Sequence, residues 1–386
     1  MSPAFLDAPA TAAILVALPG ARAVGGAVRD SLAGQPVQDV DIGAPMAPEE
    51  IARRLRAAGA KVFETGIAHG TVTAVLHGVP HEVTALRRDI ATDGRHAEVE
   101  WTTDWREDAA RRDFTINAMS MGADGVLFDY FGGQADLAAG RVMFVGDAAT
   151  RIAEDYLRIL RFFRFFARYG RGAPDASALA AIRAGVPGMA RLSVERVWME
   201  LKRLLAGPMP AEAVARMDEA GVLPAVLPEA GATDALARIV EPEPMLRLAA
   251  LLRPGADLAA LAHRLKFSGA EAAQLAAMQG ALPDGDDNAL RRALAEDGHD
   301  VLFARVALAE ARNGVDRGAL RDRLRALPRP VFPLLGRDGL SLGAAPGPAL
   351  GAALAATRAW WLARGCTDDV EACRAELARV LAQGQN

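Results

Sequence analysis

Two acidic residues two positions apart, Asp39 and Asp41, have the type and spacing of a metal-binding pair. Residues i and i+2 of a strand point to the same face, so on a strand at 38–42 the two carboxylates would converge. Two adjacent carboxylates repel each other unless a cation lies between them, and hard oxygen ligands favour Mg²⁺. A solvated strand edge is the structural alternative, and the pair alone does not exclude it.

The segment just upstream, Gly25-Gly26-Ala27-Val28-Arg29-Asp30, favours the metal site. Two glycines between a strand and a helix let the backbone approach a phosphate, and the start of a helix supplies N–H donors. Arg29, in the first turn of that helix, can pair with a phosphate oxygen. A glycine pair by itself marks only a tight turn. Its position before Asp39 and Asp41 is what indicates a site for a metal and a phosphorylated ligand.

A second group of polar residues runs from Arg111 to Asn117. Arg111 can neutralise a triphosphate, and Asp113 and Asn117 can hydrogen-bond a ribose. An exposed cluster of ion pairs, worth little in stability, fits the same residues. The spacing does not choose between these two interpretations.

The third group lies on a helix predicted from Arg151 to Arg168. Asp155 and Arg158 are i,i+3 neighbours on such a helix, so their side chains should meet. The phenylalanines between the arginines are expected in the core rather than as platforms for stacked bases. A phosphate-rich ligand would explain the remaining stripe of cations, although a surface helix with a local ion pair is the simpler structure. The stripe consists of Arg158, Arg161, Arg164 and Arg168.

The charge distribution supports a polyanion-binding surface in the same part of the chain. Residues 1–150 carry 13 Lys and Arg against 20 Asp and Glu, whereas residues 151–203 carry 11 against 5. A basic segment behind an acidic domain is what a groove for a polyanion requires.

The elements that must position these residues are of two kinds. Residues 1–145 read as mixed α and β, and after residue 145 helical periodicity dominates to the end. A polar stretch at 88–108 with the turn signal Asp93-Gly94 is predicted to be a mobile loop. The other elements expected in the first part are strands at 21–25, 38–42, 61–64, 71–77 and 81–86, and helices at 27–33 and 48–58.

Length and composition limit the class of protein. With 386 residues the chain is expected to form two or more domains, and 51% hydrophobic and 24% charged residues argue against disorder. Its apolar runs are far shorter than the roughly 18 residues that span a bilayer. The two cysteines cannot form a disulfide framework, and no Lys or Arg precedes the apolar N-terminal stretch. These features predict a cytoplasmic protein.

The three groups, in this order and spacing, resemble the class II tRNA nucleotidyltransferase and poly(A) polymerase family of the polymerase β superfamily. The resemblance covers about residues 20–205. It rests on Gly25-Gly26 with Arg29-Asp30, Asp39 with Asp41, Arg111-Arg112-Asp113, a hinge-like segment at 129–137, Glu154-Asp155-Tyr156-Leu157-Arg158 and a helix at 192–201. The loop with Asp93-Gly94-Arg95-His96 also has a counterpart in the family.

The resemblance implies an α/β nucleotidyltransferase head with a mixed β-sheet, followed by an all-α neck, body and tail. The expected domains are a catalytic head at 1–145, a neck at 146–205, a tRNA-binding body at 206–330 and a tail at 331–386. The implied reaction adds C, C and A to the 3′ end of tRNA from CTP and ATP without a nucleic-acid template. Mg²⁺ is the implied cofactor, and neither a membrane nor a protein partner is implied.

The same resemblance assigns roles to the candidate residues. Asp39 and Asp41 are implied as catalytic metal ligands, with Glu82 or Asp113 as a possible third carboxylate. Asp155 and Arg158 are implied as the pair that selects the nucleotide. The residues implied to hold the nucleotide are Gly26, Arg29, Arg111, Asp155, Arg158, Arg161 and Arg164.

Other functions share parts of this pattern. A poly(A) polymerase shares the head, but the arginine-rich insertion and the longer basic extension usual in that group are not visible. An enzyme that adds only C or only A is also consistent with the sequence. A non-catalytic RNA-binding protein is the alternative of a different class, and the intact Asp39 and Asp41 argue against it.

Overall fold

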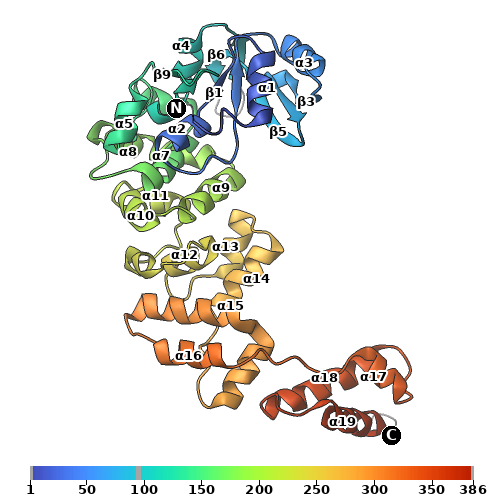
Figure 1. The fold of residues 1–386 in the computed structure, drawn as a ribbon. Coiled ribbons are helices and arrows are strands. Elements are labelled where there is room, and N and C mark those ends of the chain that lie inside the picture. The colour runs from blue at the N-terminus through green and yellow to red at the C-terminus, as the bar shows by residue number, and fades with distance from the viewer. Residues whose placement is uncertain (1–2, 93–96, 384–386) are drawn as a thin grey trace. The chain divides into compact units, whose positions relative to one another are not determined.

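The computed structural model describes residues 3–92 and 97–383 of the chain. These residues form two compact units, one ending at Pro228 and the other beginning at Glu229. The first unit begins with a β-sheet and helices, and helices follow through the rest of the chain (Figure 1). The predicted fold class is therefore confirmed. The four predicted domains, with boundaries after residues 145, 205 and 330, stay predictions.

A mixed sheet is the framework of the first unit. Within the described residues it has seven strands in the order β3-β4-β5-β2-β1-β8-β9. β2 and β5 pair in parallel, and the other neighbours pair antiparallel. The strands are β1 (Arg22–Val24), β2 (Ile42–Ala44), β3 (Lys61–Gly66), β4 (Thr71–Leu76), β5 (Val79–Ala85), β8 (Ser120–Met121) and β9 (Leu127–Phe128). The early helices are α1 (Pro9–Ala17), α2 (Gly26–Leu32) and α3 (Pro48–Ala57).

The strand predicted at 38–42 is wrong by several residues. β2 starts only at Ile42, because the buried residues Ile42, Gly43 and Ala44 are the ones that pair with β1 and β5. Asp39 and Asp41 lie on the exposed segment that leads into this strand. The other strands and helices predicted before residue 87 are present, with shifts of one or two residues at their ends.

The mobile loop predicted at 88–108 is also wrong. The segment contains a hairpin of β6 (Arg87–Thr92) and β7 (Ala97–Trp101), followed by α4 (Trp105–Ala110). The alternation of apolar and acidic residues along β7 is a strand signal that the high charge of the segment obscured. The predicted turn at 93–96 lies outside the described residues.

Helices complete the first unit after the sheet. α7 is the longest of them and buries the phenylalanines expected in the core, including Phe162 and Phe165. Phe162 stacks on Phe144 with ring centroids 5.8 Å apart, and Phe144 lies 4.9 Å from Phe114. This aromatic cluster fixes α7 against the segment that follows α4. The helices are α5 (Gly133–Ala139), α6 (Ala148–Glu154), α7 (Leu157–Tyr169), α8 (Ala176–Gly185), α9 (Val194–Leu205), α10 (Pro210–Glu219) and α11 (Val222–Val226).

The second unit is built from helices packed around leucine-rich clusters. One cluster contains Leu290, Leu302 and Leu324. Its longest helix, α15, is broken at Gly298, whose φ of 77° lies outside the helical region. The helices are α12 (Pro244–Leu251), α13 (Leu258–Leu265), α14 (Gly269–Met278), α15 (Asp287–Asn313), α16 (Gly318–Ala326), α17 (Gly336–Ser341), α18 (Pro348–Ala363) and α19 (Val370–Gln383).

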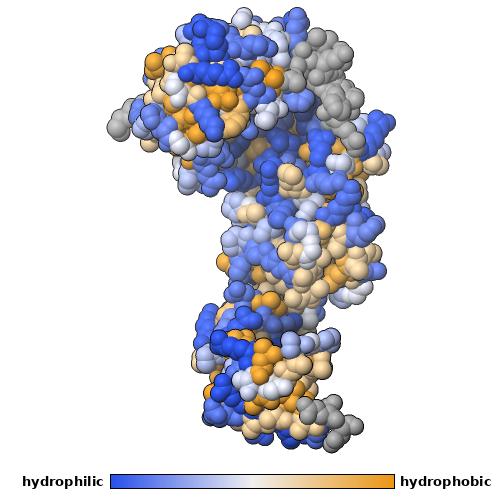
Figure 2. Space-filling view, turned by 90° about the vertical axis from the view of Figure 1, so that its right-hand side faces the viewer, coloured by the Kyte–Doolittle hydropathy of each residue, from blue (hydrophilic) through white to orange (hydrophobic). Residues whose placement is uncertain are grey.

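Among the described residues, none of the helices combines the length and the apolar character needed to cross a membrane. On the face of the molecule shown in Figure 2, hydrophilic and hydrophobic residues are mixed.

Candidate active site

A cavity of about 390 Å³ in the first unit brings together most of the predicted site residues. A volume of this size suits a small-molecule ligand. From the residues assigned to the metal or the nucleotide, it is lined by Gly26, Arg29, Asp41, Arg111, Asp155, Arg158 and Arg161. Gly25, Arg112, Asp113 and Asn117, which the sequence analysis also named, line it too, and Leu157, Phe165 and Arg196 complete the lining. Asp39 borders a second cavity of about 430 Å³, and Arg164 contacts Glu200 away from the lining.

Asp41 and Glu82 occupy neighbouring positions at the start of the parallel pairing of β2 and β5. Ile42 of β2 is the register partner of Val83 of β5, so in this parallel pair Asp41 and Glu82 occupy equivalent positions one residue earlier. Partial removal from water raises the pKa of Asp41, and the charges of Glu82 and Asp39 raise it further, against the opposing effect of Arg112. Removal from water and neighbouring negative charges disfavour the ionised form of Asp41, and a bound cation would offset both effects.

Asp113 has a different environment, since protein donors surround it. Its Oδ2 lies 2.6 Å from both Nε and Nη2 of Arg161, and its Oδ1 accepts hydrogen bonds from the amide of Asn117 and the backbone N–H of Phe114, both at 2.9 Å. Burial alone would raise the pKa of Asp113, but Arg161 and these hydrogen bonds outweigh it and lower the pKa. Asp113 therefore acts as a buried anion that fixes Arg161 at the wall of the cavity.

Gly25 provides the turn that brings Arg29 to the cavity. Gly25 precedes α2 with a φ of 62°, a conformation that residues with a side chain rarely adopt. The guanidinium of Arg29 then donates from Nε to Asp30 at 3.0 Å and from Nη1 to the side-chain oxygen of Asn117. The side chain of Arg29 is only 11% exposed.

Arg111 and Arg112 share one buried partner, Asp108, which sequence reasoning missed. Arg111 donates to Asp108 from Nε at 2.9 Å and from Nη2 at 2.7 Å, and Arg112 reaches the other oxygen at 3.1 Å. Burial and the neighbouring charge of Arg112 lower the pKa of Arg111 to about 10. The i,i+3 and i,i+4 spacing on α4 was the available signal for this contact.

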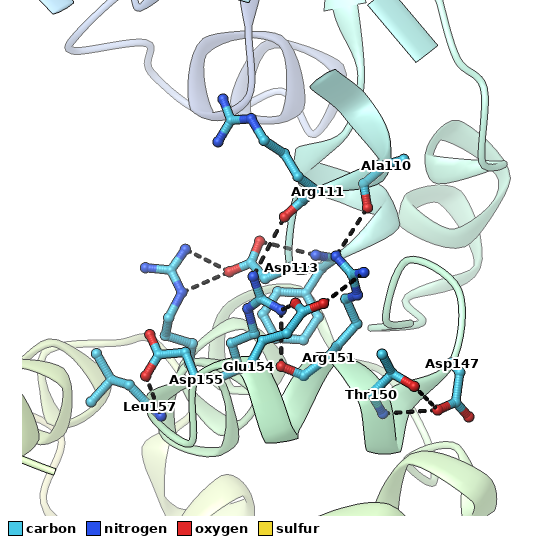
Figure 3. A network of polar contacts seen from close by, with 12 residues as sticks. Ala110, Arg111, Asp113, Asp147, Thr150, Arg151, Glu154, Asp155 and Leu157 are labelled. Atoms are coloured by element: carbon cyan, nitrogen blue, oxygen red, sulfur yellow. Dashed lines mark hydrogen bonds and ion pairs between the residues drawn. The ribbon is translucent and has the colours of Figure 1, made fainter. Parts of the chain in front are cut away.

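Asp155 and Arg158 both line the cavity, but they do not form the predicted ion pair with each other. Figure 3 shows the carboxylate of Asp155 joined instead to the backbone of Leu157. Asp155 accepts from the backbone N–H of Leu157 at 3.0 Å and from Nη2 of Arg196 at 2.6 Å. Arg158 donates to the carboxylate of Glu154 and, at 2.8 Å, to the carbonyl of Arg151. The reason is a break in the predicted helix: α6 ends before Asp155, whose φ of −154° is extended.

Two residues of α9 that the sequence did not single out bind side chains of the site, Arg196 an aspartate and Glu200 the arginines of α7. Arg196 comes from α9 and ties Asp155 to that helix. Glu200, one turn later and 4% exposed, accepts from Nε of Arg164 at 2.6 Å and lies 3.7 Å from Arg161. The stripe of arginines on α7 is therefore partly neutralised within the protein.

Comparisons with known proteins agree with this geometry. Residues 21–143 match the family described as "Poly A polymerase head domain", and residues 174–233 match "Probable RNA and SrmB- binding site of polymerase A". The solved CCA-adding enzyme of Bacillus stearothermophilus in complex with CTP has a TM-score of 0.74 and 28% identity, with full coverage of both chains. The Thermotoga maritima CCA-adding enzyme complexed with tRNA shares the fold, with a TM-score of 0.62 at 19% identity over 99% of this chain and 98% of that one.

Curated relatives share more of the sequence, with about 40% identity over half of the chain or more. The "CCA tRNA nucleotidyltransferase 1, mitochondrial" of Danio rerio is 40% identical over 366 residues, which cover 88% of this chain and 83% of the relative. The CCA-adding enzyme of Geobacillus thermodenitrificans is 41% identical over 201 residues, 52% of this chain and 48% of the relative. The chain thus spans most of the fish enzyme and about half of the bacterial one. It belongs to the family of CCA tRNA nucleotidyltransferases within the polymerase β superfamily, and it is a nucleotidyltransferase.

Proposed function

We propose that the protein adds C, C and A to the 3′ end of tRNA, using CTP and ATP and releasing pyrophosphate. The observation that carries this proposal is the single cavity that places the carboxyl of Asp41, a set of arginines and the pair of Asp155 and Arg158 around one small-ligand site. The family membership and the relatives that bind CTP or tRNA support it.

Mg²⁺ is the proposed cofactor, held by Asp39 and Asp41. Among residues 3–92 and 97–383, no preformed cluster of three or more His, Cys, Asp or Glu side chains has the geometry of a metal site. A pair of carboxylates such as Asp39 and Asp41 would suffice for Mg²⁺, which proteins usually bind through one or two carboxylates together with substrate phosphates and water. When bound, the metal activates the attacking hydroxyl and stabilises the leaving pyrophosphate. Glu82 is the better candidate for a third carboxylate than Asp113, whose oxygens are engaged by Arg161, Asn117 and Phe114.

The triphosphate would lie against the cations of the cavity. Arg29 of α2, Arg111 just after α4 and Arg161 of α7 line it, and Gly26 leaves the backbone accessible. Each of the three arginines is fixed by a carboxylate partner, so little side-chain entropy is lost when a phosphate binds. The role of Arg164 is indirect in this proposal, because its guanidinium is bound to Glu200.

Base selection would use Asp155 as acceptor and Arg158 as donor. Cytosine and adenine each present an amino donor beside a ring-nitrogen acceptor, whereas uracil and guanine present the opposite polarity. The carboxylate of Asp155 and the guanidinium of Arg158 bind different partners and not each other. A base could therefore hydrogen-bond to both groups. One pair of side chains can then admit C and A without a template strand.

The tRNA would lie along residues 151–203 and the helices that follow, rather than on the acidic head. The support is the excess of arginine in that segment and the family match at residues 174–233. A cytoplasmic location stays a prediction. Poly(A) synthesis and addition of only C or only A remain the alternative outcomes of the test.

The test supplies purified protein with tRNA that lacks its 3′ end, Mg²⁺, and CTP and ATP separately and together. Sizing the products should show two added residues with CTP alone and three with both nucleotides. Long A-tails, or addition of a single kind of nucleotide only, would overturn the proposal.

A further inference from the structure

Tyr169 ends α7 outside the lining of the active-site cavity, yet it is bound to that lining through Asp30. We propose that Tyr169 is a positioning residue that holds Arg29 in the orientation in which it binds a triphosphate. The inference rests on the proposed function, because it assumes that the ligand of Arg29 is a nucleotide.

The contact between Arg29 and Asp30 is the first reason. Adjacent residues of a helix point in different directions and do not normally face each other. In α2, however, Nε of Arg29 donates to Oδ1 of Asp30 at 3.0 Å, and Nη2 lies 2.9 Å from the same oxygen. The guanidinium therefore lies against the carboxylate of the next residue, and a group outside the helix that contacts both side chains would hold it there.

Tyr169 is that group, since it contacts both members of the pair. Its hydroxyl donates to the same Oδ1 of Asp30, and its ring centroid lies 4.8 Å from the guanidinium carbon of Arg29. Tyr169 is buried, and burial together with the hydrogen bond to Asp30 raises its pKa, so the phenol keeps the proton that it donates.

The guanidinium of Arg29 has further partners. Nη1 of Arg29 donates to the side-chain oxygen of Asn117, and the ring of Phe165 lies 5.0 Å from the guanidinium carbon. A guanidinium has five N–H donors, and these contacts use only part of them. The remaining donors are available to phosphate oxygens in the cavity that Arg29 lines.

In this arrangement, residues of one helix, α7, act on both the base and the triphosphate of the nucleotide. α7 carries Arg158 and Arg161 in its first two turns and Tyr169 at its last residue. Arg158 and Arg161 line the cavity directly, and Tyr169 acts on it through Asp30 and Arg29. Because the triphosphate is common to CTP and ATP, an effect of Tyr169 should be the same for both nucleotides.

The experiment replaces Tyr169 by Phe, which removes only the hydroxyl. Tyr130→Phe is the matched control, because the Tyr130 hydroxyl accepts a hydrogen bond from Arg22 at 3.3 Å and does not line the cavity. KM and kcat are measured for CTP and ATP, and binding of inorganic tripolyphosphate to each folded protein is measured by calorimetry. Tripolyphosphate reports the phosphate site without base, ribose or turnover.

For Tyr169→Phe we expect KM to rise roughly three- to tenfold by the same factor for CTP and ATP, with little change in kcat, because ground-state binding is weakened. The dissociation constant of tripolyphosphate should rise by a similar factor, and Tyr130→Phe should match the wild type. Unchanged tripolyphosphate binding in Tyr169→Phe would overturn the inference, even if the thermal stability falls. A wild-type protein that binds tripolyphosphate but adds no nucleotides would refute the proposed function and leave the Tyr169 comparison intact.

Discussion

Replacing Asp155 by Asn tests whether this residue reads the base. The substitution keeps the size of the side chain and an oxygen that can accept from Leu157, so the start of α7 remains capped. It replaces one acceptor oxygen by an amino donor. That change reverses part of the hydrogen-bond polarity offered to a base, so uracil and guanine should become better substrates and cytosine and adenine poorer ones.

The size of the effect follows from the contacts of the carboxylate. An ionised carboxylate has about four acceptor positions, and Leu157 and Arg196 occupy one on each oxygen. Positions remain on both oxygens for the amino group of a base. One hydrogen bond to a charged group is worth about 1.5–3 kcal/mol, and a tenfold ratio corresponds to about 1.4 kcal/mol. The preference for CTP over UTP should therefore fall by roughly one to two orders of magnitude.

The assay measures kcat/KM for CTP and UTP on tRNA that lacks its 3′ end. Asp147→Ala is the control, because Asp147 caps the start of α6 through Thr150 at 2.8 Å, and α6 is the helix that ends before Asp155. The control should lower the thermal stability, because a helix cap is lost, and keep the wild-type ratio of CTP to UTP. If Asp155→Asn slows the reaction but keeps that ratio, Asp155 is a structural partner of Arg196 and the reasoning on base polarity is refuted.

Three further predictions follow from the same cavity. Asp41→Asn should abolish nucleotide transfer while the protein stays folded, and near-normal turnover of this variant in a Mg²⁺ titration would contradict the metal assignment. Glu82→Gln should raise the Mg²⁺ concentration needed for the half-maximal rate. The lowered pKa of Asp113 means that its contribution to stability is present above about pH 3.9, the unfolded value, and is lost as the pH falls through the folded value. Asp113→Asn should thus lower the free energy of unfolding by about 2–3 kcal/mol near pH 7, because it weakens the ion pair with the partly exposed Arg161. The same variant should show a weaker loss of stability at acid pH when unfolding by urea is measured across the pH range. Finally, affinity for tRNA should fall steeply with salt, since arginine–phosphate contacts release counterions, and a flat dependence in a filter-binding titration would rule out residues 151–203 as the RNA surface.

Local patterns in the sequence predicted most of the elements, and together with the family resemblance they named most of the residues that line the cavity. The glycine pair at Gly25 and Gly26 predicted the turn into α2, and the phenylalanines of α7 were expected in the core. The helical remainder after residue 145 was equally clear from periodicity. Where the prediction was wrong, two signals competed: the charge of residues 88–108 hid the alternation of β7, and the acidic pair at 39 and 41 was assigned to a strand that begins at the next apolar residue.

The partners of the arginines were beyond the reach of sequence patterns, because they depend on tertiary packing. Asp155 and Arg158 have the spacing of an i,i+3 pair, but that rule holds only within a continuous helix, and α6 ends before Asp155. The extended backbone there turns the carboxylate toward Arg196, which lies 41 residues later. Arg161 likewise reaches Asp113, which lies 48 residues earlier. The stripe of arginines in the sequence therefore indicated a polyanion site. Only the fold shows which of these arginines are bound by Asp113 and Glu200, and which of their N–H groups still face the cavity.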